Sequence, residues 1–151
     1  MKRKLWIILA LTALILALGA GAALADQSGT CGTNVTWTYT EANHKLTISG
    51  TGAMADFTNS SSAPAPWSSF NAEIQTVEIR SGVTTIGQQA FYDCTGLTGI
   101  TIPSGVTSIG RYAFRGCSGL TGITLPSSVT GIGYDAFSGC SARAVMYASL
   151  I

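Results

Sequence analysis

The sequence predicts a β-rich repeat solenoid in which each 23-residue coil supplies a short strand and a short helical turn, with a β-hairpin cap at the amino-terminal end. Three observations predict this fold class. Cysteines 94, 117 and 140 recur at intervals of 23 residues, each inside the same apolar phrase. Apolar and polar residues alternate ahead of the repeats. Charged residues make up only 10% of the chain, whereas glycine occurs 18 times. A fixed period of this length is typical of stacked coils joined by tight turns.

The repeats align without gaps. The three copies are GVTTIGQQAFYDCTGLTGITIPS from Gly82, GVTSIGRYAFRGCSGLTGITLPS from Gly105 and SVTGIGYDAFSGCSARAVMYASL from Ser128. A half repeat precedes them, and its Ile74, Val77 and Ile79 occupy the places of Leu97, Ile100 and Ile102. The solenoid is therefore expected over residues 73–151, with a last copy that is degenerate or truncated because Arg143 replaces the core leucine.

Each copy contains a strand signal and a turn signal. Leu97, Ile100 and Ile102 have the spacing of a short strand in which alternate residues point to one side, so Thr101 faces outward. In the second copy Ala113, Phe114 and Cys117 stand at i, i+1 and i+4, which places them on one face of a single helical turn. The phenylalanines of successive coils are expected to form one column.

Residues 26–72 are interpreted as a cap and loop. Val35, Trp37 and Tyr39 alternate with threonines, and Leu46 and Ile48 alternate again after a short turn, which is typical of a β-hairpin. The following stretch is rich in serine and proline and is expected to be an irregular loop anchored by Trp67 and Phe70. We expect this block to cover the apolar end of the first coil.

Residues 1–25 have the pattern of a signal peptide. A basic segment, Lys2 to Lys4, precedes the apolar run Leu5 to Leu18, and Ala23-Leu24-Ala25 supplies a small-x-small cleavage pattern. The alternative is an uncleaved membrane anchor, because the apolar stretch is about 20 residues long. Cleavage predicts a secreted or cell-surface protein with no membrane span in the mature chain.

Charge excludes some partners. From Asp26 onward, five basic residues oppose seven acidic ones, so the net charge is −2. The arginines are scattered and form no basic stripe that could neutralise phosphates, which makes nucleic acid an unsuitable partner. The charge does not favour anionic lipid either.

Four cysteines in an exported chain would ordinarily indicate disulfides. The 23-residue spacing argues against them, because equivalent side chains in successive strands lie about 4.8 Å apart and run parallel, while a disulfide needs Cβ atoms about 3.8 Å apart. Cys94, Cys117 and Cys140 are therefore interpreted as a ladder of buried thiols. Cys31 stands outside the ladder and its redox state is left open.

The phrase V-T-x-I-G-x-x-A-F-x-x-C-x-x-L-T-x-I-T-I/L-P resembles the BspA-type leucine-rich repeat over Ile74 to Cys140. The amino-terminal block, with Thr30-Cys31-Gly32 and Pro66-Trp67, is similar to the leader region that often precedes these repeats. The resemblance implies a leucine-rich-repeat fold and a bacterial secreted or surface protein, in some cases an adhesin. It implies no catalytic motif.

The residues themselves do not predict an enzyme. The single histidine, His44, lies in the predicted hairpin turn and is interpreted as a solvated turn residue. No second histidine or acidic cluster accompanies it, so neither a nucleophile and base pair nor a metal site is expected, and no cofactor motif is present.

Two surfaces remain as candidate partner-binding faces. The first is the outward strand face, where hydroxyl groups stack at equivalent positions, and the second is the opposite face, where tyrosine and arginine supply the composition of interface hot spots. The strand-face candidates are Thr76, Glu78, Thr101 and Thr124; those of the opposite face are Tyr92, Arg111, Tyr112, Arg115 and Tyr134. The sequence therefore predicts a non-enzymatic, exported module that binds an extracellular protein or glycan. The alternative is a structural spacer or a fragment of a larger multi-repeat surface protein.

Overall fold

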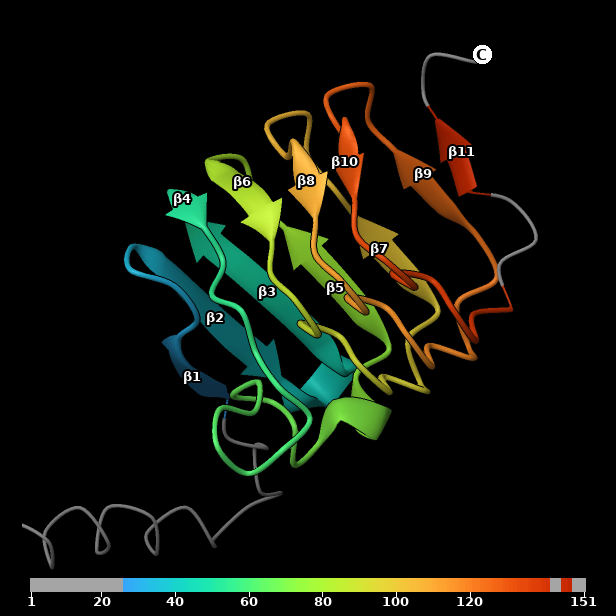
Figure 1. Cartoon of the computed structure of the whole chain (residues 1–151). Helices are drawn as coiled ribbons and strands as arrows, with labels where there is room; N and C mark the ends of the chain where they lie inside the picture. The colour runs from blue at the N-terminus through green and yellow to red at the C-terminus, as the bar shows by residue number, and fades with distance from the viewer. Residues whose placement is uncertain (1–25, 142–144, 148–151) are drawn as a thin grey trace, which may run out of the picture.

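The computed structural model describes residues 26–141 and 145–147, which form short strands joined by turns (Figure 1). The predicted signal peptide and Arg143 lie outside the described residues. The strands are β1 (Gln27–Thr30), β2 (Val35–Thr40), β3 (Lys45–Gly50), β4 (Gly52–Ala53), β5 (Thr76–Ile79), β6 (Val83–Ile86), β7 (Gly99–Thr101), β8 (Ser108–Ile109), β9 (Ile123–Leu125), β10 (Gly131–Ile132) and β11 (Val145–Tyr147). Two 3₁₀ helices, η1 (Glu41–Asn43) and η2 (Asn71–Glu73), both precede the three full repeats.

The largest sheet has the order β1-β2-β3-β5-β7. Strands β1, β2 and β3 pair antiparallel, and η1 connects β2 to β3. Strands β3, β5 and β7 then pair parallel, so that Lys45 faces Thr76 and Thr76 faces Gly99. Because β3 belongs to both kinds of pairing, strands β1 to β3 form a continuous sheet with β5 and β7 of the repeats.

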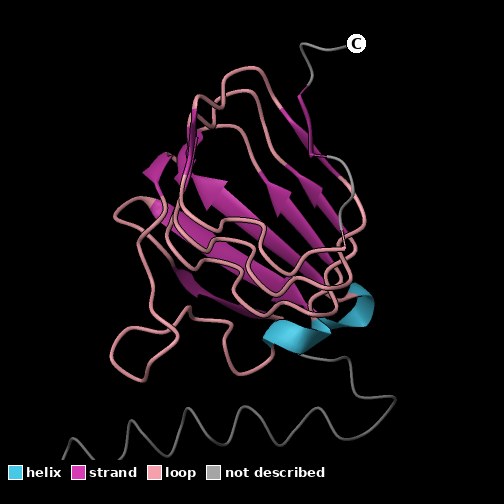
Figure 2. Cartoon of the chain, turned by 45° about the vertical axis from the view of Figure 1, so that its right-hand side comes forward, coloured by secondary structure: helices cyan, strands magenta, loops and turns pink. Residues whose placement is uncertain are grey.

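A second, parallel sheet has the order β10-β8-β6-β4. Its register follows the repeat, with Thr85 opposite Ser108 and Ser108 opposite Gly131. The two sheets face each other in Figures 1 and 2, and the buried core residues come from both sheets and from the turns. Strand β9 lies beside β7 but pairs with β11 instead, so the ladder of the large sheet ends at β7 within the described residues.

The third side of each repeat, here called the turn side, comprises residues 87–94, 110–117 and 133–140. The predicted helical turn is wrong: the described repeats contain successive tight turns and no helix. Along the chain, a backbone amide that donates to a carbonyl of its own turn alternates with one that donates to a carbonyl of the next repeat. In the second repeat the turns join Ala113 to Gly110, Arg115 to Tyr112 and Cys117 to Phe114, and the links between repeats join Tyr112 to Tyr134, Phe114 to Ala136 and Gly116 to Ser138.

The physical reason is backbone geometry. Tyr112 and Gly116 have φ angles of 58° and 78°, in the left-handed region that an α-helix cannot contain. Their amides consequently point along the stack of repeats instead of back into a helix. The spacing of apolar residues indicates which side chains are buried, but it does not indicate the direction of the backbone N–H groups.

The phenylalanines form the expected column on this side. Phe91 and Phe114 stack with ring centroids 5.2 Å apart, and Phe114 and Phe137 with centroids 5.3 Å apart and planes within 2°. Cys94, Cys117 and Cys140 follow the same register; Cys94 and Cys117 are buried as predicted, whereas Cys140 is only half-buried. These three cysteines and Cys31 are all free thiols. The Sγ atoms of Cys117 and Cys140 donate to the carbonyls of Phe91 and Phe114 at 3.0 and 3.1 Å.

The loop before the repeats replaces a missing repeat at the start of this stack. In the second repeat, the carbonyl oxygens of residues 111, 113 and 115 each accept a hydrogen bond from a backbone amide of the first repeat. The equivalent carbonyl oxygens of the first repeat are those of Gln88, Ala90 and Tyr92. Three separate groups satisfy these equivalents. They are the Phe57 amide on Gln88 (2.9 Å), the Trp67 indole Nε1 on Ala90 (2.8 Å) and the Asn71 Nδ2 on Tyr92 (3.2 Å).

Trp67 is central to this cap. Its side chain is 1% exposed, and its ring stacks on Phe91 with centroids 5.7 Å apart and planes within 17°. Trp37 and Phe57 pack edge-on against it. One side chain therefore supplies both the ring and the N–H that a preceding repeat would have contributed.

Within residues 26–141 and 145–147, no helix is long and apolar enough to span a bilayer.

Candidate functional site

The strand face is the outward side of the large sheet. Thr76 and Glu78 on β5 alternate with buried residues and point outward, and Thr101 faces Glu78 from β7. Lys45 Nζ forms an ion pair with Glu78, and Arg80 Nε lies 3.4 Å from the same carboxylate. The hydrogen bond from Lys45 lowers the pKa of Glu78 below its ordinary value, with further lowering by the charges of Lys45 and Arg80.

A shallow hollow of about 570 Å³ lies on this face between Lys45 and Thr101. Gly99 belongs to its lining, and a Cβ atom at this position would meet nothing within 4 Å. Thr124 is exposed on β9, but it pairs with Met146 of β11, so the ladder that joins Glu78 to Thr101 does not continue to it. The structure therefore brings together Thr76, Glu78 and Thr101, with Thr124 beyond the break in the ladder.

On the turn side, Arg111, Tyr112, Arg115 and Tyr134 form the Arg–Tyr cluster. The Arg111 guanidinium carbon lies 4.5 Å from the Tyr112 ring centroid and 5.5 Å from that of Tyr134, and its Nη2 donates to the Tyr112 hydroxyl at 2.7 Å. The Arg115 guanidinium carbon lies 5.1 Å from the centroid of the Tyr112 ring. The two tyrosine rings meet edge-on at 5.8 Å. Arg111, Tyr112 and Tyr134 thus contact one another, and Arg115 joins them through Tyr112.

Sequence reasoning missed a charged neighbour of the cluster. Asp135 Oδ2 lies 3.8 Å from Arg115 Nη1. Arg115 and Asp135 stand at different repeat positions, so this contact is diagonal between repeats. Ile132 is 40% exposed and Tyr134 68% exposed, and these are the only large exposed apolar side chains of the described part of the chain.

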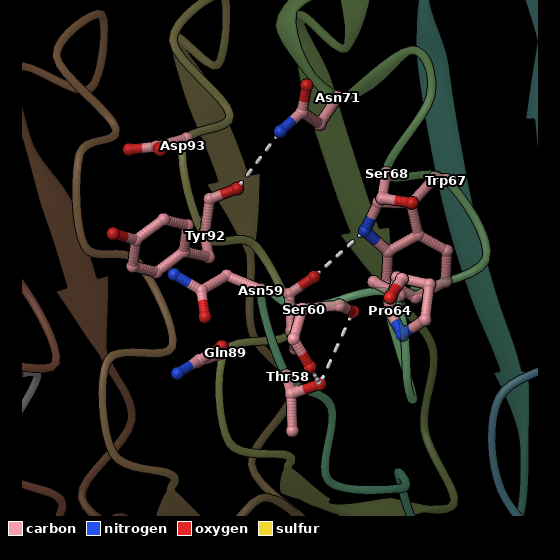
Figure 3. A pocket seen from close by; sticks show the side chains of 13 residues that line it. Thr58, Asn59, Ser60, Pro64, Trp67, Ser68, Asn71, Gln89, Tyr92 and Asp93 are labelled. Atoms are coloured by element: carbon pink, nitrogen blue, oxygen red, sulfur yellow. Dashed lines mark hydrogen bonds between the residues drawn. The ribbon is translucent and has the colours of Figure 1, made fainter.

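Tyr92 lies elsewhere. It occupies the position of Arg115 one repeat earlier, and it lines a half-open hollow of about 480 Å³ between the loop 58–71 and the turn 89–93 (Figure 3). This cap hollow was not predicted, because its lining combines a loop without periodicity and the first full repeat.

Other chemistry-bearing residues have structural surroundings. His44 Nδ1 lies 3.0 Å from the Tyr39 hydroxyl and the residue is half-buried, so it is less solvated than predicted. Burial raises the pKa of the Cys31 thiol to about 12, which leaves it protonated and unreactive at neutral pH. The described residues contain no cluster of three or more His, Cys, Asp or Glu side chains suited to a metal ion.

Comparison with solved structures supports the fold. A leucine-rich-repeat protein from Eubacterium ventriosum is 28% identical, with a TM-score of 0.63 over 82% of this chain and 40% of its own length. Leucine-rich-repeat proteins from T. pallidum and Bacteroides ovatus are 24% and 23% identical, with TM-scores of 0.44 and 0.47. They are matched over 78% and 80% of this chain and over 71% and 37% of their own lengths. No curated protein matches the chain.

The family model described as "BspA type Leucine rich repeat region (6 copies)" matches residues 67–149. The match begins at Trp67, the residue whose ring heads the phenylalanine column. It covers more than half of the chain and includes the first two 23-residue copies and all but the last residue of the third. The strand-rich fold is therefore of leucine-rich-repeat type, and the chain belongs to the BspA-type leucine-rich-repeat family.

Proposed function

We propose that this protein is an exported, non-enzymatic interaction module that binds an extracellular protein partner through the Arg–Tyr cluster. Leucine-rich-repeat regions of this type are generally protein-interaction modules. The basic and apolar segments of residues 1–25 support export to the exterior or the cell surface. A glycan is the alternative partner class.

The observation that carries this proposal is that the Tyr134 ring is exposed and yet already held in place by neighbouring side chains. A tyrosine ring that is 68% exposed is normally mobile, but here Arg111 lies over it and over Tyr112. Because these side chains already contact one another, a partner immobilises them at a reduced entropy cost. Tyrosine and arginine are also the residue types enriched in binding hot spots.

The charge balance of the cluster indicates the partner's chemistry. Arg115 is paired with Asp135, whereas Arg111 contacts aromatic rings and a hydroxyl. The cluster therefore carries net positive charge next to apolar surface from Ile132 and Tyr134. A protein segment with one carboxylate beside an apolar or aromatic side chain fits this surface.

The experiment measures binding of the purified protein to a panel of extracellular matrix proteins and, in a second arm, to a glycan array. The double variant Arg111→Ala/Tyr134→Ala should weaken protein binding at least tenfold. Thr101→Ala/Thr124→Ala on the strand face is the matched control and should change affinity less than twofold. Each of these side chains lies outside the core.

Other outcomes would redirect or end the proposal. Loss of binding in the threonine variant alone would assign the site to the strand face. Unchanged affinity in both variants would show that neither predicted face binds the partner, and binding only on the glycan array would replace the partner class.

A structural spacer, or a part of a larger multi-repeat surface protein, is the second candidate function. It is supported by the fact that the chain spans 40% of the length of the Eubacterium ventriosum protein. Further 23-residue copies encoded directly after the last codon would favour this function, and a partner bound through the Arg–Tyr cluster would argue against a pure spacer.

A further inference from the structure

The cap hollow exists because a loop replaces a repeat. Between successive repeats, regular backbone links bring the turns together, whereas the corresponding carbonyls of the first repeat receive three separated donors from the cap, on Phe57, Trp67 and Asn71. The chain between the first two donors bulges outward, and a space of about 480 Å³ remains (Figure 3). This volume lies within the range of about 300 to 1,000 Å³ that is usual for small-ligand sites.

The walls of the hollow are polar and carry one charge. Asn59 and Gln89 contribute amides, Ser60 a hydroxyl, Tyr92 a phenol and Asp93 a carboxylate, and Figure 3 shows these side chains gathered opposite Trp67 and Pro64. The described lining contains no lysine, arginine or histidine. An anionic ligand would therefore meet a carboxylate without a compensating cation, which favours a neutral one.

Part of the lining is held in place. The Gln89 backbone amide donates to the Arg111 carbonyl at 3.0 Å, and the Asn71 side chain donates to the Tyr92 carbonyl. Gln89 lines the hollow, and its buried Oε1 atom accepts no hydrogen bond from the described residues. Most buried acceptors in proteins are hydrogen-bonded, so the amide oxygen of Gln89 retains an accepting capacity that the protein does not use.

We propose that the cap hollow binds a neutral monosaccharide or disaccharide. Each sugar hydroxyl both donates and accepts, which matches a wall of amides, hydroxyls and one carboxylate. The C–H face of a sugar ring can lie against the half-buried Tyr92 ring. The site is separate from the Arg–Tyr cluster and does not depend on it.

The test is ligand-detected saturation-transfer NMR on the purified protein, followed by calorimetry for each sugar that binds. The panel contains glucose, galactose, mannose, N-acetylglucosamine, maltose and cellobiose, with glucuronic acid as the anionic comparison. At least one neutral sugar should bind, and Asn59→Ala and Asp93→Asn should each weaken its binding at least tenfold. Both side chains are exposed, and asparagine tolerates the φ of 53° at position 93.

Asp135→Asn is the matched control, because Asp135 also has a φ of 53° but lies outside the hollow. It should leave affinity unchanged, and thermal unfolding of all three variants should occur at the temperature of the unmodified protein. Absence of any neutral-sugar signal would overturn the proposal. Tighter binding of glucuronic acid, or full affinity in the Asn59 and Asp93 variants, would overturn it as well.

Discussion

The turn side of the repeats and their strand side, which is formed by the large sheet, differ in how strictly they follow the 23-residue register. On the turn side, three links per repeat, a stack of rings and a line of thiols follow the same 23-residue register from the first repeat to the third. On the strand side, the parallel ladder that starts at β3 ends at β7, and β9 pairs separately with β11. The turns and the smaller sheet therefore keep the 23-residue register through all three repeats, whereas the large sheet keeps it only as far as β7.

Glycines show the same contrast. A Cβ atom at Gly110 on the turn side would lie 2.5 Å from the Gln88 nitrogen and 2.7 Å from the Gly87 carbon, so glycine is required there by the neighbouring backbone. A Cβ atom at Gly99 or Gly122 on the strand side would meet nothing within 4 Å. One set of glycines is needed for packing, and the other leaves bare backbone on the surface.

The largest expected effect is on the ring column. Phe114→Ala should lower the free energy of unfolding by about 3 to 5 kcal/mol, because a fully buried ring between two stacked rings is lost. Urea denaturation followed by circular dichroism measures this change. Ile100→Ala, at a half-buried position of β7, should cost about 2 kcal/mol. Equal costs at the two positions would contradict the proposed difference between the sides.

The second test inserts a methyl group on the turn side. Gly110→Ala should cost about 3 kcal/mol, because the new Cβ meets backbone atoms that cannot rotate away. Gly105→Ala is the control, since its Cβ would lie 3.6 Å from the Val83 carbonyl oxygen, an ordinary contact. A stable Gly110→Ala protein would show that the repeats can separate locally.

The third test measures how the buried Cys31 thiol of the cap makes stability depend on pH. The folded pKa of Cys31 is raised by burial from 9.0 to about 12, so folding disfavours its thiolate. Its contribution to stability is complete below about pH 9 and is lost as the pH rises toward 12, and the loss at pH 11 is about 2 to 3 kcal/mol. Urea denaturation at pH 8 and pH 11 measures this loss. Cys31→Ala should show a smaller decrease between these pH values, and an identical decrease would exclude Cys31 as its source.

The fourth test adds a side chain to the strand side. Gly99→Ala should raise the free energy of unfolding by about 0.5 to 1 kcal/mol, because the unfolded chain loses freedom and the folded chain has room. Thermal unfolding detects the shift. Destabilisation would mean that the bare backbone at Gly99 is structurally required.

The smallest effect is expected at the surface ion pair. Asp135→Asn removes the partner of Arg115 at 3.8 Å, and both side chains are more than a third exposed, so stability should change by less than about 0.5 kcal/mol. The change is checked by denaturant titration at low and high salt. A cost above 1 kcal/mol would show that the Arg–Tyr cluster contributes to folding as well as to binding.

The sequence predicts the column and the thiols well, because residues 91, 114 and 137 stand at one repeat position and stacking follows from translation by one period. It does not predict the turns, because burial at i, i+1 and i+4 is compatible with a helix and with alternating tight turns. The cap was predicted as a cover anchored by Trp67. The hydrogen bond from the Trp67 indole N–H to the Ala90 carbonyl was not predicted. Here a side-chain donor takes the place of a backbone donor, and no periodicity of the sequence relates the two.

The candidate sites divide in the same way. Contacts between residues 111 and 134 follow from equal repeat positions, and the sequence placed them on one face. The contact between Arg115 and Asp135 runs diagonally and was missed. The cap hollow could not be foreseen at all, since its shape depends on how an irregular loop returns to the repeats.

The way in which Trp67 completes the stack has a consequence for how such chains diversify. Outside the cap, the tryptophan contacts the first repeat through one carbonyl and one ring. Duplication or deletion of a whole 23-residue unit further along the gene leaves those contacts unaltered. A lineage can therefore lengthen or shorten the array in integral steps while inheriting a single, unchanged starting block.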